Sequence, residues 1–143
     1  MSKLERENGA PVSWKTYAFL MVTGGSRSGT IGGLLYIAGD RIVFEDFEPE
    51  RTVYSLFIRR RSEYKKYRIS APVNSIRTIT LTTERYAGQV LRGRRLPADL
   101  PELDLLQRLF GRTIHMILFD DGSTWFCEIY DRRGLEQYLK EHV

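Results

Sequence analysis

The sequence predicts a mainly β (α+β) fold: a small barrel of about seven short strands, with a helix at its C-terminal end and a short inserted helix. Apolar and polar residues alternate through most of the chain, which is typical of half-buried strands. Two dipeptides that favour tight hairpins, Gly39-Asp40 and Asp121-Gly122, separate such segments. Because exposed sheet edges invite unwanted pairing, we expect a closed or nearly closed barrel with one opening covered by a helix.

The predicted strands follow the alternation in order. Residues 14–22 form the first strand, and residues 30–47 hold two more that meet at Gly39-Asp40. Residues 51–60 and 66–71 are two further candidates, connected by a basic run. Residues 74–83 alternate cleanly and are rich in β-branched side chains, which favour strands. Residues 112–130 form the last hairpin, which turns at Asp121-Gly122.

Two segments have helical features. Residues 84–111 interrupt the strands as an insertion, which begins as a basic loop and ends as a short helix. Asp99 is placed to cap that helix with Glu102 as its capping-box partner, and Gly111 suits its end. An apolar stripe runs along it: Leu100, Leu103, Leu106, Leu109 and Phe110. Asp131 is placed to cap a second helix over residues 131–143, which presents Leu135, Tyr138 and Leu139 on one face.

The length of 143 residues fits one domain. Residues 1–12 have almost nothing to bury, so we expect a disordered tail followed by a single domain over residues 13–143. The one cysteine, Cys127, has no partner for an internal disulfide, and the chain shows neither a secretory leader nor an apolar run of membrane-spanning length. We therefore expect a cytoplasmic protein, with any membrane contact peripheral.

Positive charge is concentrated in the middle of the chain. Residues 59–95 carry eleven Arg and Lys side chains against Glu63 and Glu84, a local balance of +9, whereas the rest of the chain sums to −5. Such asymmetry steers anionic partners, although basic loops also serve simply as solvated connections. The candidate residues for binding an anion or partner are Arg59, Arg60, Arg61, Lys65, Lys66, Arg68, Arg92, Arg94 and Arg95.

The residue types do not favour catalysis, a metal or a cofactor. His115 lies within a predicted strand, and no nucleophile and orienting acid can be assigned around it. Cys127 is expected to be a buried, inert thiol. The two histidines and the cysteine lack metal-ligand spacing, and the glycines of "TGGSRSGTIGG" are not followed by the Gly-Lys-Ser/Thr of a phosphate-binding loop. We therefore expect no catalytic residue, no metal site and no cofactor.

One hairpin has a familiar pattern: Gly33, Leu35, Tyr36, Arg41, Ile42, Val43 and Phe44. It resembles the opening hairpin of GRAM domains and bacterial pleckstrin-homology-like domains. Pro72, Ile76 and Ile79 resemble the next recurring piece, and the final hairpin and helix complete the order of parts. Two departures are Ala38, where threonine is frequent, and the insertion. The resemblance implies a non-catalytic module that binds lipid headgroups, peptides or other proteins.

Three binding hypotheses stay open. In the leading one, the basic loop engages a protein partner or an anionic, phosphate-bearing membrane surface, with Tyr64 and Tyr67 beside it. The second is a barrel of the PilZ type that binds cyclic di-GMP, although its R-x-x-x-R and D/N-x-S-x-x-G patterns are absent. The third is binding of RNA or single-stranded DNA through interleaved basic and aromatic residues.

The inserted helix suggests a separate contact surface. Leu103, Leu106, Leu109 and Phe110 either pack back onto the barrel or form a hydrophobic contact with another chain, and packing onto the barrel is the favoured alternative.

Overall fold

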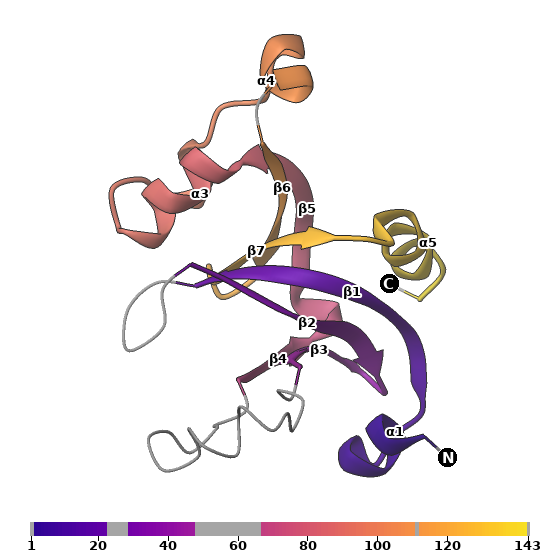
Figure 1. The fold of residues 1–143 in the computed structure, drawn as a ribbon. Helices are drawn as coiled ribbons and strands as arrows, with labels where there is room; N and C mark the ends of the chain where they lie inside the picture. The colour runs from indigo at the N-terminus through magenta and orange to yellow at the C-terminus, as the bar shows by residue number, and fades with distance from the viewer. Residues whose placement is uncertain (1, 23–28, 48–66, 111, 143) are drawn as a thin grey trace, which may run out of the picture.

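The computed structural model describes residues 2–22, 29–47, 67–110 and 112–142, and within them the chain forms one antiparallel sheet of seven strands (Figure 1). The strand order is β4-β3-β2-β1-β7-β6-β5. The strands are β1 Val12–Val22, β2 Gly29–Ala38, β3 Arg41–Asp46, β4 Arg68–Pro72, β5 Ile76–Thr83, β6 Thr113–Phe119 and β7 Thr124–Ile129. The helices are α1 Lys3–Asn8, α3 Glu84–Leu91, α4 Leu105–Phe110 and α5 Arg132–His142, with short 3-10 turns η1 Val73–Ser75 and η2 Pro97–Asp99.

The predicted hairpins are confirmed. β2 and β3 turn at Gly39 and Asp40, where Gly39 has a φ of 61°, and β6 and β7 turn around Gly122, whose φ is 86°. Glycine takes these left-handed conformations without steric cost, which explains its place in both turns. The strands predicted at residues 14–22, 66–71 and 74–83 correspond to β1, β4 and β5. The strand predicted at residues 51–60 lies outside the described residues.

The sheet is strongly curved but not closed. β4 and β5 are its two edges, yet only the three residues of η1 join them. Seven strands laid flat would span roughly 29 Å from edge to edge, since neighbours lie about 4.8 Å apart. Three residues cannot cover that distance, so the sheet must curl to bring the edges together at this corner. Within the described residues no ladder joins β4 to β5, so the sheet is not closed and the predicted barrel is not confirmed. Pro72, which lacks an N–H, ends β4, and η1 then leads β5 away from it (Figure 1).

The main core lies on the inner face of the curved sheet, which we define as the face covered by α5. Its buried side chains come from five strands, η1 and the helix: Ala18, Leu20, Leu35, Ile37, Ile42, Phe44, Val73, Ile117, Phe119, Cys127, Ile129 and Leu135. Tyr138 and Leu139 of α5 pack against them. The predicted cap is confirmed, because Asp131 Oδ1 accepts a hydrogen bond of 3.1 Å from the Gly134 N–H. Asp131 Oδ2 also accepts one of 3.1 Å from Trp14 Nε1, which ties α5 to β1.

Two helices cover separate parts of the opposite, outer face. α3 places Ala87 on Ile114, Met116 and Phe126, and α1 places Leu4 near the cluster of Tyr36, Ala38 and Val43. The helix α1 falls within residues 1–12, for which we expected a disordered tail. Ser2 and Glu5 form a reciprocal capping box, and Gly9 ends the helix with a φ of 63°. These local signals, together with contact by Leu4, account for the helix.

The insertion differs in detail from its predicted form. Residues 84–91, expected to be a basic loop, form the helix α3, capped by the Thr83 hydroxyl, which accepts from the Tyr86 N–H. Asp99 ends the short turn η2 rather than capping a helix. The cap of α4 is Asp104 instead: its Oδ1 accepts from the Gln107 N–H at 2.7 Å, and Gln107 Oε1 accepts from the Asp104 N–H at 3.2 Å. The sequence D-x-x-Q at this position is an equivalent capping box that starts five residues later.

Candidate functional site

The basic run between β3 and β4 contributes one described residue to the candidate site. Arg59, Arg60, Arg61, Lys65 and Lys66 lie outside the described residues. Arg68 begins β4, and its guanidinium contacts two groups of the protein itself: Nε lies 3.3 Å from Glu45 Oε1, and an Nη donates to Asn8 Oδ1 at 2.7 Å. Arg68 therefore acts as a structural link between α1 and the sheet, although the sequence suggested a ligand-binding role.

The partners of Arg68 belong to a polar network that the sequence did not predict. Glu45 is buried within β3, and Tyr36 beside it on β2 donates its hydroxyl hydrogen to Glu45 Oε1. Asn8 Nδ2 donates to the Tyr36 oxygen at 2.9 Å. Burial, followed by the hydrogen bond to Glu45, raises the pKa of Tyr36. Alternation placed Glu45 within a strand, but nothing in the sequence named its partners.

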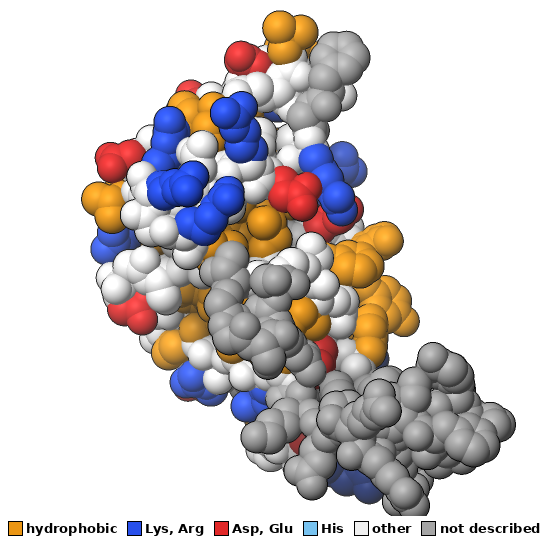
Figure 2. Space-filling view, turned by 60° about the vertical axis from the view of Figure 1, so that its left-hand side comes forward, with side chains coloured by type: hydrophobic (Ala, Val, Ile, Leu, Met, Phe, Trp, Pro, Cys, Tyr) orange, Lys and Arg blue, Asp and Glu red, His pale blue; other side chains and the backbone are white. Residues whose placement is uncertain are grey.

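Four arginines form an exposed cluster on α3 and the loop that follows it, which we call the arginine face: Arg85, Arg92, Arg94 and Arg95. Figure 2 shows Lys and Arg side chains gathered over this part of the molecule. Within the described part of the chain, none of the four forms an ion pair with a carboxylate. Three of them, Arg92, Arg94 and Arg95, were predicted as partner-binding residues, and the fold does place them together.

Two members of the arginine face are positioned by contacts within the insertion. Arg92 Nε donates to the Gly88 carbonyl oxygen at 3.0 Å, and the Arg95 guanidinium lies over the Tyr86 ring at 5.3 Å from its centre. Tyr86 is in turn held by Gln107 Nε2, which donates to its hydroxyl at 3.2 Å. A guanidinium has five N–H donors, so each arginine keeps donors free for an external anion.

The insertion also carries four exposed leucines, one in the loop after α3 and three on α4, which we call the leucine tip: Leu96, Leu105, Leu106 and Leu109. Their side chains are 65–72% exposed. Figure 2 shows apolar side chains at the end of the molecule where Figure 1 places α4, beyond α3. The predicted stripe is divided, because Leu103 is buried, whereas Leu106 and Leu109 face solvent. The side chain of Phe110 is not described.

Arg68, the one described member of the basic run, does not lie with the arginine face. Arg68 lies in β4 near one end of the sheet, whereas the arginine face follows β5 at the other end (Figure 1). The insertion therefore forms a surface of its own. The sequence signal for α3 is the spacing of Ala87, Val90 and Leu91 after the Thr83 cap. Gly88 and the surrounding arginines obscured it.

The residues considered for catalysis are part of the scaffold. Cys127 is fully buried, and burial raises the pKa of its thiol to about 12. Burial, aided by the charge of Arg132, lowers the pKa of His115. Asp121 Oδ1 accepts from the Ser123 N–H at 2.8 Å, which closes the final hairpin turn. Among the described residues, no three His, Cys, Asp or Glu side chains are grouped as a metal site requires.

Comparisons with known proteins do not assign a function. No family model matches the chain, and no curated protein matches it. One solved structure is similar, the crystal structure of the C-terminal domain of an unknown protein from Leishmania infantum, at 12% sequence identity and a TM-score of 0.49. The match covers 96% of this chain and 93% of that chain. In the part of the chain that the structure describes, no helix is both long and apolar enough to cross a bilayer.

Proposed function

We propose that this chain is a non-catalytic binding module of the pleckstrin-homology-like or GRAM-like type, and that its insertion binds an anionic, phosphate-bearing membrane surface. The class is supported by the curved antiparallel sheet with its C-terminal helix across the inner face. The membrane assignment depends on one observation: the insertion carries both four exposed arginines without ion pairs in the described residues and four exposed leucines. The proposed membrane contact is therefore the insertion, and not the loop at residues 59–68 that the sequence favoured.

The arginine face supplies the electrostatic part of the contact. Guanidinium groups bind phosphate oxygens through two parallel hydrogen bonds, and each basic residue near an anionic surface contributes about 1 kcal/mol of attraction. Arg92 and Arg95 are already oriented by Gly88 and Tyr86, so they lose less side-chain freedom on binding.

The leucine tip distinguishes a membrane from an acidic protein or a nucleic acid. A leucine side chain that moves fully out of water contributes roughly 1.5–3 kcal/mol, and exposed leucines beside basic residues are typical of surfaces that enter the headgroup region. A nucleic acid, or a protein surface that is acidic and polar throughout, requires the arginines but gives Leu105, Leu106 and Leu109 no comparable environment.

Vesicle sedimentation tests this function. We expect the protein to sediment with phosphatidylcholine vesicles that contain phosphatidylserine and to stay in solution with phosphatidylcholine alone. Replacing Arg92, Arg94 and Arg95 by Ala should abolish the binding, because the charge is lost. Replacing Leu105, Leu106 and Leu109 by Ser should weaken it at unchanged charge. Arg133→Ala, an exposed change on α5, serves as the control and should bind like the wild type.

The variants that lose vesicle binding distinguish the membrane function from the alternative functions. Equal binding to both kinds of vesicle, or no binding to either, would rule out the membrane function. An arginine variant that loses binding while the leucine variant keeps all of it would show that charge alone holds the protein at the vesicle and that the leucine tip does not enter the bilayer. Titration with cyclic di-GMP or single-stranded RNA then tests the nucleotide and nucleic-acid alternatives.

A further inference from the structure

We propose that the edge of β5 and the groove between β5 and α5 bind an extended peptide segment of another protein, which adds to the sheet as an eighth strand. β5 is the last strand of the sheet, with β6 on one side and no strand on the other within the described residues. An edge strand offers unpaired backbone N–H and C=O groups that an extended chain can pair with. This site is separate from the arginine face and the leucine tip.

The two edges of the sheet differ in how well they are protected. β4 has only five residues and ends at Pro72, which cannot donate a backbone hydrogen bond. β5 has eight residues, "IRTITLTT", with no proline and one charged side chain, Arg77. Length, β-branched composition and freedom from proline all favour pairing, so β5 is the edge suited to accept a strand.

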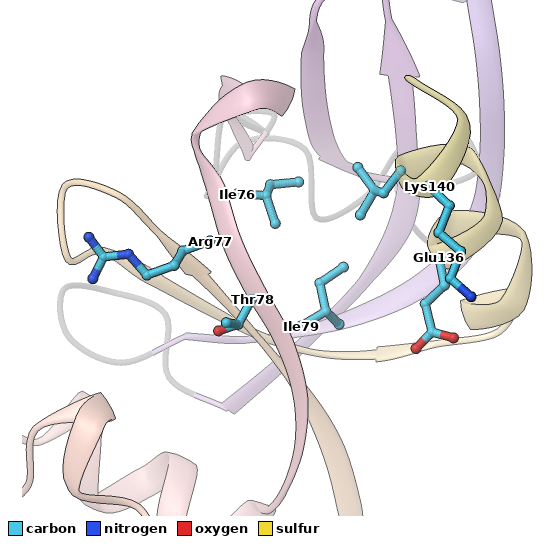
Figure 3. A pocket seen from close by; sticks show the side chains of 7 residues that line it. Ile76, Arg77, Thr78, Ile79, Glu136 and Lys140 are labelled. Atoms are coloured by element: carbon cyan, nitrogen blue, oxygen red, sulfur yellow. The ribbon is translucent and has the colours of Figure 1, made fainter. Parts of the chain in front are cut away.

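A groove of about 340 Å³ runs beside this edge, between β5 and α5. Figure 3 shows Ile76 and Ile79 pointing from β5 toward the helix, while Arg77 points away. With Leu139 of α5, these isoleucines give the groove an apolar lining. An added strand would lie about 4.8 Å from β5 and would direct alternate side chains to the same side, so apolar residues at every second position can enter the groove.

The charged residues of the groove further specify which peptide it can bind. Three charged side chains line the groove. Glu136 pairs with Arg132 at 3.5 Å, and Arg77 pairs with Asp120 at 3.5 Å. Lys140 is exposed and forms no ion pair in the described part of the chain. The uncompensated charge at the groove is therefore positive, so the segment that fits it combines alternating apolar residues with an Asp or Glu near Lys140.

Selection from a displayed library of random short peptides tests the proposal on the intact protein. Enriched peptides should have apolar residues at alternate positions and an acidic residue at a fixed place. Lys140→Glu should weaken binding of an enriched peptide by roughly fivefold, since the charge pair becomes a repulsion. Arg133→Glu makes the same charge change on α5 outside the groove and should leave the affinity unchanged. Hydrogen exchange should show new protection at alternate amides of β5.

Three results would overturn the proposal. The first is a selection without enrichment. The second is an enriched peptide whose binding is indifferent to Lys140→Glu and whose protection lies away from β5. The third is a stable dimer in light scattering with β5 amides already protected, because a second copy of this chain would then fill the edge.

Discussion

At the scale of single residues, the buried carboxylate of Glu45 connects elements that are far apart in the sequence. It accepts from the Tyr36 hydroxyl and lies 3.3 Å from Arg68 Nε, while Asn8 bonds both Tyr36 and Arg68. The network therefore joins α1, β2, β3 and β4. A buried charge is tolerated only when such partners surround it, so the docking of α1 and the stability of the sheet edge are coupled.

The first prediction concerns Tyr36→Phe, which removes the hydroxyl and leaves the ring. The buried Glu45 carboxylate loses a donor and Asn8 loses an acceptor, so the free energy of unfolding should fall by about 1–3 kcal/mol in urea titration. Hydrogen exchange of α1 should also accelerate. Arg77→Ala removes an ion pair with Asp120 whose side chains are both well exposed, and it should cost less than about 0.5 kcal/mol. Equal stability of Tyr36→Phe and wild type would show that the network is not coupled to folding.

At the scale of elements, the glycines within two helices, Gly134 of α5 and Gly88 of α3, have different roles. A Cβ at Gly134 of α5 would lie 2.0 Å from Asp131 Oδ2 and 2.8 Å from Trp14 Nε1. At Gly88 of α3 it would meet only the end of the flexible Arg92 side chain, at 3.0 Å. Helix propensity alone would make Gly134 a weakness of the helix, because it does not show how closely the capping aspartate and the tryptophan approach this position.

The second prediction compares these two positions. Gly134→Ala should destabilise the protein by about 1–2 kcal/mol, because the new methyl group displaces the Asp131 cap and its bond to Trp14. Gly88→Ala should be neutral or stabilise by up to about 1 kcal/mol through helix propensity. Thermal unfolding followed by circular dichroism measures both. If the two variants shift the melting temperature in the same direction and by the same amount, the close packing at Gly134 has no energetic role.

A comparison of the predicted and observed elements shows which parts of the fold the sequence could predict. Alternation and turn glycines located the hairpins, and Asp131 located the start of the last helix, since these are local signals. α3 was missed because its apolar spacing is short and is surrounded by arginines. The sequence left open whether the sheet closes, because closure depends on whether β4 and β5 pair, and that is set by the corner at Pro72 and η1 rather than by either strand.

At the scale of the whole molecule, the scaffold separates two proposed contacts. The insertion after β5 carries the arginine face and the leucine tip, whereas the groove lies between β5 itself and α5. Among the described residues, the positive charge that the sequence presented as one feature is divided between the structural Arg68, Arg77 paired with Asp120, and the exposed arginines of α3 and the loop after it. Only the three-dimensional arrangement distinguishes these roles.

The central claim is that the leucine tip enters an anionic membrane. Because Cys127 is fully buried, a new thiol made by Leu106→Cys can be labelled selectively with an environment-sensitive dye. Lys3→Cys on α1, at the other end of the sheet, provides the control (Figure 1). On adding phosphatidylserine-containing vesicles, the account predicts a blue shift for the dye at position 106 and none at position 3. An unchanged spectrum at position 106 when the protein is bound to vesicles, or equal shifts at both positions, would contradict it.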